Sequence, residues 1–111
     1  MTIYTSTNAK KQVGKLAKLY EDGQVSETTA RTLNKVLDFE VNQIQTDLTA
    51  TEKDLSEFEV RYNMSTINFY SQWQAGKTDD HMDYVEWASL AQMADNLRKR
   101  LEFLSTSESQ K

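Results

Sequence analysis

The residues best suited to chemistry lie in one short acidic segment that contains the only histidine of the chain. Its ionisable residues are Asp79, Asp80, His81, Asp83 and Glu86. On a helix, Asp83 and Glu86 would share one face because they are three residues apart, so a hard cation held by carboxylates and an imidazole is conceivable. Acidic residues at a helix start also complement the positive end of the helix dipole. Because only one histidine is present, we expect this capping role and no metal site.

Catalytic signatures outside this segment are missing from the sequence. The absence of cysteine excludes disulfides, thiolate zinc sites and a cysteine nucleophile. No activated nucleophile lies near His81 in the sequence. The three glycines are isolated and do not form a phosphate-binding loop: Gly14, Gly23 and Gly76. We therefore expect neither an enzyme nor a cofactor.

Charge is distributed unevenly along the 111 residues, although the net charge is only −4. Residues 1–20 carry four lysines and no acid, whereas residues 38–59 carry seven acids against Lys53 alone. The four lysines, candidates for nucleic-acid contact, are Lys10, Lys11, Lys15 and Lys18. A turn at Gly23 resembles that of a helix-turn-helix, but the helix expected after it begins with Glu27, and the isoelectric point is near 5.0. DNA binding is therefore an alternative to contact with another protein.

The elements that position these residues are expected to be helical. Zero proline and three glycines supply too few turn residues for a sandwich or a doubly wound sheet, so the predicted fold class is all-α. A chain of 111 residues suits one domain with a modest core. The uncharged runs are short and polar, and the N-terminal MTIYTSTNAKK has no apolar stretch. We therefore expect a cytoplasmic protein without a membrane span.

Apolar periodicity and capping residues divide this single domain, residues 1–111, into four helices. The predicted helices span 8–22, 26–62, 66–75 and 80–104, followed by a frayed tail at 105–111. Residues 1–7 are β-branched and polar, which predicts a short strand or a loose arm. Ser26 is placed to cap the second helix, and Gly23 to end the first in the left-handed conformation.

Two heptad seams of similar length follow one another along the chain. The first consists of Val41, Ile44, Leu48, Thr51, Leu55, Phe58 and Tyr62. The second consists of Trp87, Leu90, Ala94, Leu97, Leu101 and Leu104. Matched seams joined by a short connector predict a long antiparallel helical hairpin, coiled-coil-like, with a short connector helix and an N-terminal helix.

The connector carries the residues expected to form the closed end of the hairpin. Asn63 tolerates the left-handed conformation, and Ser65 can cap the connector helix. Met64 and Phe69 occupy the positions of a hydrophobic staple around that cap. The hairpin-tip residues are Tyr62, Met64, Ser65, Phe69, Trp73, Gly76, Asp80 and Trp87. We expect the aromatic rings among them to plug the closed end.

Apolar residues in the first half of the long helix exceed what the fourth helix can cover. They are Leu33, Val36, Leu37, Phe39 and Val41. An exposed apolar surface of this size normally marks an interface. We therefore expect an oligomer, either a homodimer or a complex in which this surface docks onto another protein.

The stretch RYNMSTINFYSQWQAGKTDDHMDYVEWASL, residues 61–90, resembles a group of small helical prokaryotic proteins with a KYGMSSEEF…F.AGELGDD.D.FEW signature. The matching positions are Phe58, Glu59, Tyr62, Met64, Ser65, Phe69, Gln74, Ala75, Gly76, Asp80, Asp83, Glu86, Trp87 and Ala88. The similarity extends over residues 16–104. Members of the group look like antitoxins, the companions of small toxins in two-gene modules. This chain departs from the pattern at Asn63, Trp73 and Lys77-Thr78, differences that would alter partner choice at the tip.

The resemblance implies a non-enzymatic protein that binds and neutralises a small partner protein, a possible toxin. In such a complex, acidic residues that flank the first seam would cover a basic surface of the partner. The residues expected to make this contact are Asp47, Glu52, Asp54 and Glu59. Two alternatives stay open: a structural coiled-coil homodimer or adaptor, and a DNA-binding autoregulator that uses the basic N-terminal residues.

Overall fold

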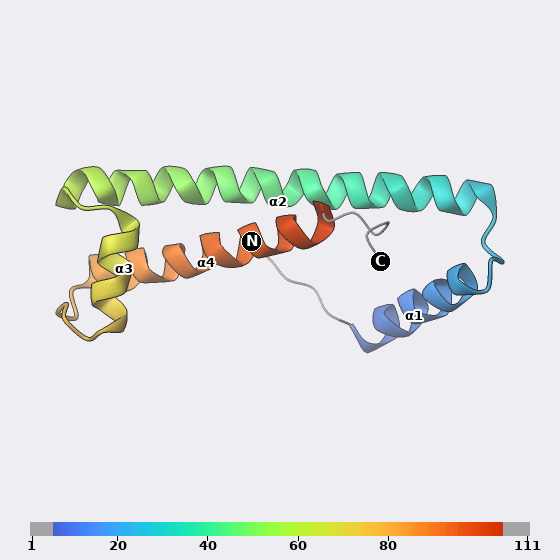
Figure 1. Ribbon diagram of the computed structural model, residues 1–111, viewed down its shortest axis with the longest axis horizontal. Coiled ribbons are helices and arrows are strands. Elements are labelled where there is room, and N and C mark those ends of the chain that lie inside the picture. The colour runs from blue at the N-terminus through green and yellow to red at the C-terminus, as the bar shows by residue number, and fades with distance from the viewer. Residues whose placement is uncertain (1–5, 106–111) are drawn as a thin grey trace. The chain divides into compact units, whose positions relative to one another are not determined.

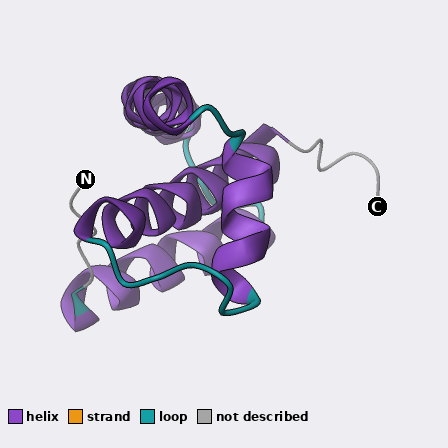
Figure 2. Ribbon diagram, turned by 90° about the vertical axis from the view of Figure 1, so that its left-hand side faces the viewer, coloured by secondary structure: helices purple, strands orange, loops and turns teal. Residues whose placement is uncertain are grey.

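The computed structural model describes residues 6–105, and every element in that range is an α-helix (Figures 1 and 2). The helices are α1 (Thr7–Glu21), α2 (Glu27–Tyr62), α3 (Thr66–Gln74) and α4 (Met82–Ser105). The predicted all-α class with four helices is therefore confirmed. None of the helices in the described range is long and apolar enough to cross a membrane.

The first helix begins earlier than expected from the sequence. Ser6 is its N-cap, because the Ser6 hydroxyl accepts a hydrogen bond from the backbone N–H of Ala9 at 3.2 Å. Thr7 is already helical, so assigning residues 6 and 7 to a strand or arm was wrong. At the other end of the chain, Ser105 belongs to α4 and not to the tail. The expectations for residues 1–5 and 106–111 lie outside the described residues.

The chain divides into two compact units, Met1–Glu40 and Val41–Lys111, and the boundary between them falls within α2. The first unit holds α1 and the beginning of α2. The second holds the remainder of α2 together with α3 and α4. The single domain over residues 1–111 stays a prediction.

In the first unit, local capping determines where α1 ends and where α2 begins. Gly23 takes the left-handed conformation, with φ of 67°. The next residue, Gln24, donates its backbone N–H to the Leu19 carbonyl at 2.9 Å, which satisfies a free carbonyl of the last turn. Ser26 then accepts the Thr29 N–H at 3.2 Å, the predicted cap of α2. These local bonds define two helices, yet no residue between 6 and 40 is buried.

The second unit contains the hydrophobic core, which α2, α3 and α4 build together. Its buried apolar residues are Ile44, Leu48, Leu55, Phe58, Phe69, Trp87, Ala88, Ala94 and Leu97. Thr51 is also buried, and its hydroxyl is satisfied because it donates to the carbonyl of Asp47 at 2.8 Å. Most of the two predicted seams therefore lie in or against this core, where their side chains are removed from water.

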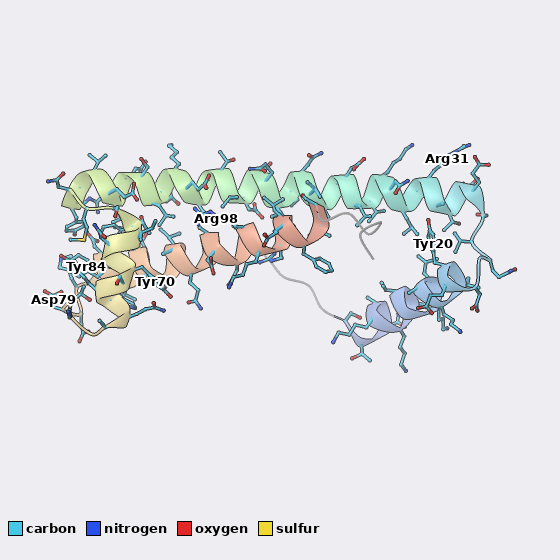
Figure 3. All side chains as sticks on the ribbon, in the orientation of Figure 1. Tyr20, Arg31, Tyr70, Asp79, Tyr84 and Arg98 are labelled. Carbon is cyan, nitrogen blue, oxygen red and sulfur yellow. The ribbon has the colours of Figure 1, made fainter. Side chains whose placement is uncertain are left out.

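Contacts between α2 and α4 run in opposite directions along the two helices. Residues near the end of α2 meet residues near the start of α4, and earlier residues of α2 meet later residues of α4. The Arg61 guanidinium lies 3.0 Å from the Asp83 carboxylate. The rings of Phe58 and Trp87 follow, with centroids 5.6 Å apart. Further along, Arg98 lies 3.2 Å from Glu52, and Figure 3 labels Arg98 on the side of α4 that faces α2.

A sharp turn joins α2 to α3, which Figure 1 shows beside α4. Asn63 has φ of 51°, the left-handed conformation that asparagine tolerates better than most residues. The Ser65 hydroxyl accepts the Asn68 N–H at 3.1 Å and caps α3 as predicted. Gly76, with φ of 73°, follows the end of α3 and turns the chain toward α4. Local backbone preferences thus place α3 where its aromatic residues meet those of α4.

Candidate functional site

The first candidate is an apolar surface in the first unit, which we call the uncovered face. It consists of Leu33, Val36, Leu37 and Phe39. Leu33 is half-buried, whereas Val36, Leu37 and Phe39 are 54%, 50% and 69% exposed. Val41, the fifth residue predicted for this surface, begins the second unit and is half-buried. The uncovered face has no chemistry beyond its apolar side chains, and an exposed apolar surface is typical of an interface.

Helix α1 shows the same lack of cover. Val13, Leu19 and Tyr20 are all exposed, and α1 has no buried residue. Glycine in the helix interior, at position 14, lowers the stability of the isolated helix by about 1 kcal/mol relative to alanine. A 15-residue helix that buries nothing is marginal in water, so α1 needs a packing partner to be stable.

Two of the acids expected to contact a partner are already used within the second unit. Glu52 pairs with Arg98 at 3.2 Å. Glu59 accepts the backbone N–H of Thr66 at 2.7 Å, which satisfies a free donor in the first turn of α3. Asp47 is half-buried and accepts from the Gln43 amide at 3.4 Å, a weak hydrogen bond.

Asp54 and Glu57, three residues apart on α2, make no ion pair among the described residues. Both are exposed and line a shallow hollow together with Phe58, Arg61 and Glu86. Glu57 was missed at the sequence level because nothing in the seam pattern separates it from the other flanking acids. We call Asp54, Glu57 and Glu86 the acidic hollow.

Five of the predicted tip residues lie in or against one aromatic cluster, namely Tyr62, Met64, Phe69, Trp73 and Trp87, whereas Ser65, Gly76 and Asp80 are exposed. Trp87 is completely buried, and its indole Nε1–H donates to the Thr66 hydroxyl at 3.0 Å. Phe69 stacks against it, and Tyr62 and Met64 pack against the same cluster. Trp73 is only half-buried and meets Phe69 at a ring-centroid distance of 6.1 Å. Aromatic rings thus fill the space between the three helices, with Trp87 and not Trp73 at their centre.

A polar network that no sequence pattern indicates lies beside these rings. The Tyr62 hydroxyl donates to the Asp83 carboxylate, which also accepts from Arg61 at 3.0 Å. The hydrogen bond from Tyr62 lowers the pKa of Asp83, and Arg61 lowers it further against the opposing effect of burial. The same bond raises the pKa of the Tyr62 hydroxyl. Residues 21 positions apart make this bond, so periodicity could not have revealed it.

The acidic segment serves to start α4. Asp79 accepts the backbone N–H of His81 at 2.9 Å, and the His81 Nδ1 accepts the N–H of Asp83 at 3.1 Å. This geometry makes His81 the cap and Met82 the first helical residue. Placing the helix start at Asp80 was therefore wrong, and Asp80 is exposed in the preceding loop. Among residues 6–105, no group of acidic and histidine side chains is arranged to hold a metal ion.

The four lysines proposed for nucleic-acid contact are all exposed on α1. Lys18 pairs with Asp22 at 3.5 Å, so one of them faces a carboxylate of its own helix end. Surface pairs of this kind contribute little to stability, so all four lysines are accessible to a partner. Their accessibility suits an acidic protein surface as well as a phosphate backbone.

Comparison of the chain with family models, curated proteins and solved structures gives no match. The antitoxin-like resemblance therefore stays a hypothesis.

Proposed function

We propose that this protein is a non-enzymatic protein-binding module that is completed by contact with another chain. The observation that carries the proposal is the uncovered face, three of whose four residues are half or more exposed. Residues 33–39 of α2, which hold the uncovered face, extend about 10 Å at 1.5 Å per residue. An apolar stripe of this length on a monomer leaves unfavourable contact with water that a protein partner removes.

The second unit is suited to present a second surface. Its nine buried apolar residues support an antiparallel helical hairpin that would hold the exposed carboxylates on a rigid frame. Among residues 41–105, acids outnumber basic residues eleven to six. A negative surface of this kind attracts a basic partner and gives specificity by matching its potential. In the antitoxin-like version of the proposal, the acidic hollow covers a small basic toxin and neutralises it.

The test of protein binding is affinity purification of the tagged full chain from its native host, followed by native mass spectrometry. We expect a complex that Leu37→Asp reduces at least about tenfold, because the new carboxylate would be buried without a partner. Asn42→Asp is the matched control, since it adds a similar carboxylate at an exposed polar position on another face of α2. If the wild-type chain elutes alone as a monomer, the proposed function is wrong.

Two charge-reversal variants test the antitoxin-like version of the proposal. Asp54→Lys reverses one charge of the acidic hollow, whereas Asp80→Lys makes the same change on the exposed loop before α4. A small basic protein in stoichiometric amount, lost with Asp54→Lys and kept with Asp80→Lys, would support the neutralising function. Elution of this chain only with itself would favour the structural homodimer instead.

A further inference from the structure

The two helices of the first unit carry complementary stripes that neither helix covers. Along α1 the stripe consists of Lys10, Val13, Ala17 and Tyr20. Along α2 it consists of Ala30, Leu33, Leu37 and Glu40. Both stripes advance by steps of 3, 4 and 3 residues, so each occupies one helix face.

Running the stripes in opposite directions brings chemically matched residues together. Val13 then meets Leu37, and Ala17 meets Leu33, in the small-against-large manner of an antiparallel seam. Tyr20 reaches Ala30 at one end. At the other end Lys10 faces Glu40, so the two charges of the stripes coincide. The spacing and the charges therefore specify the same register independently.

Glu40 is the feature that needs an explanation. It lies four residues after Val36 and three after Leu37, on their face of α2, and it is exposed without an ion pair among the described residues. Covering this face would bury a carboxylate, which is unfavourable unless a cation accompanies it. Lys10 is the lysine that supplies one, because Lys11 points about 100° away around α1.

The structure leaves these stripes apart within one chain. Leu37 and Val13 are exposed, and so is Tyr20, which Figure 3 labels on α1. Closure of α1 onto α2 of its own chain would bury one stripe on each helix. It would still leave Leu19 and the flanking Val36 and Phe39 without cover, because a helix pair has a single seam. Two copies provide four helices, whose additional faces cover these residues as well.

We propose that a second copy of this chain occupies the uncovered face, with α1 of each copy packed antiparallel on residues 30–40 of the other and Lys10 paired with Glu40. The inference rests on the proposed function only in taking the uncovered face as a protein-binding surface. The arrangement is isologous, because each copy donates one α1 and accepts one, and it closes as a dimer. It leaves the acidic hollow to a different partner.

The test uses charge reversal in the purified full chain, with mass followed by analytical ultracentrifugation between about 1 and 100 μM. The wild type is expected to form a dimer. Lys10→Glu and Glu40→Lys should each weaken it about tenfold, because each places like charges at both contacts of the dimer. Lys11→Glu and Asp38→Lys are the matched controls, since they make the same charge changes away from the stripes.

The decisive step is to mix the two single variants, Lys10→Glu and Glu40→Lys. In a mixed dimer, the glutamate introduced into one chain meets the lysine introduced into the other, and the reciprocal contact keeps the native pair. Such a dimer should therefore form with nearly wild-type affinity. A chain that carries both Lys10→Glu and Glu40→Lys is the comparison. If this double variant dimerises like the wild type and the mixture of single variants does not, the Lys10–Glu40 contact lies within one chain and the inference is wrong. Equal loss with the control variants would also overturn it, because the effect would then follow net charge alone.

Failure of the second-copy inference can be distinguished from failure of the proposed function. A pure wild-type chain that stays monomeric up to about 100 μM contradicts the second copy. If the same chain nevertheless elutes from its host with another protein, the protein-binding function stands. Far-ultraviolet circular dichroism of each variant shows that its helices are retained, since a loss of fold would imitate a loss of association.

Discussion

The rings of Phe69 and Trp87 lie face to face, with centroids 3.9 Å apart and planes within 1° of parallel. This pair joins α3 to α4, and the hydrogen bond from Trp87 to Thr66 joins the same two helices a few residues away. Phe58 of α2 stacks on Trp87 as well. A single indole thus contacts all three helices of the second unit, which makes it the centre of the aromatic cluster.

Replacement of Trp87 by alanine should therefore be among the most destabilising changes in the second unit. We expect a loss of about 3–5 kcal/mol in the free energy of unfolding, because the change leaves a large cavity and removes three ring contacts, with Phe58, Tyr62 and Phe69. Urea denaturation followed by circular dichroism measures it. The control is Ile67→Ala, whose side chain is 83% exposed and should cost under about 0.5 kcal/mol.

Trp73→Ala provides the comparison within the same cluster. Only a buried ring can account for a loss of stability as large as that expected for Trp87→Ala, and the ring of Trp73 is half-buried. The loss should accordingly be smaller, about 1–2 kcal/mol, in proportion to the apolar area that Trp73 removes from water. A Trp73 variant as unstable as the Trp87 variant would contradict this placement of the two rings.

Asp83 should make stability depend on pH at both ends of the range. Its lowered pKa means that its contribution is present above about pH 4, the ordinary carboxyl value, and is lost as pH falls through the lowered pKa. The raised pKa of Tyr62 acts in the opposite sense: the contribution is present below about pH 10 and is lost as pH rises through the raised value.

The measurement is the urea midpoint as a function of pH for the wild type, Asp83→Asn and Tyr62→Phe. Asp83→Asn and Tyr62→Phe should each reduce the loss of stability at both acid and alkaline pH, since each removes the Tyr62–Asp83 interaction that shifts both pKa values. Asp95→Asn is the control, because it alters an exposed pair with Lys99 on the same helix. If Asp95→Asn reduced the loss of stability at acid pH by the same amount, that loss would follow from net charge and not from Asp83.

Glu59 should matter for stability more than its sequence position suggests. Glu59→Ala removes the acceptor for the Thr66 N–H at the start of α3, and we expect a loss of about 1–2 kcal/mol. Glu59→Gln keeps a neutral acceptor and should lose less. Glu57→Ala, an exposed neighbour on α2, should change the free energy of unfolding by under about 0.5 kcal/mol. Indistinguishable values for Glu59→Ala and Glu57→Ala would contradict the capping role.

Divalent metal should leave the melting temperature unchanged. The nearest candidate ligands already accept backbone N–H groups, since Asp79 bonds His81 and the His81 ring bonds Asp83. Differential scanning fluorimetry with Mg²⁺, Ca²⁺ or Zn²⁺ checks this. A saturable rise in melting temperature that His81→Ala abolishes would mean that the segment binds metal after all.

Sequence reasoning placed the helices well where local chemistry determines their ends. Ser26 and Ser65 cap their helices through bonds to backbone groups three residues away, and Gly23 and Gly76 take the positive φ that ends a helix. It misplaced the start of α4, because a histidine ring and not an aspartate caps that helix. Side-chain caps of this unusual kind are not distinguished by residue preference.

Periodicity and capping residues were enough to predict the helical class, the apolar faces and the helix boundaries to within two residues, because these depend on interactions within a few residues of one another. The residues that each face meets depend on how the helices pack. This packing buries Trp87 while leaving Trp73 partly exposed, and it uses Glu52 and Glu59 internally, through contacts between residues 7 to 46 positions apart. It also leaves residues 33–39 uncovered, because a face becomes core only where another helix covers it.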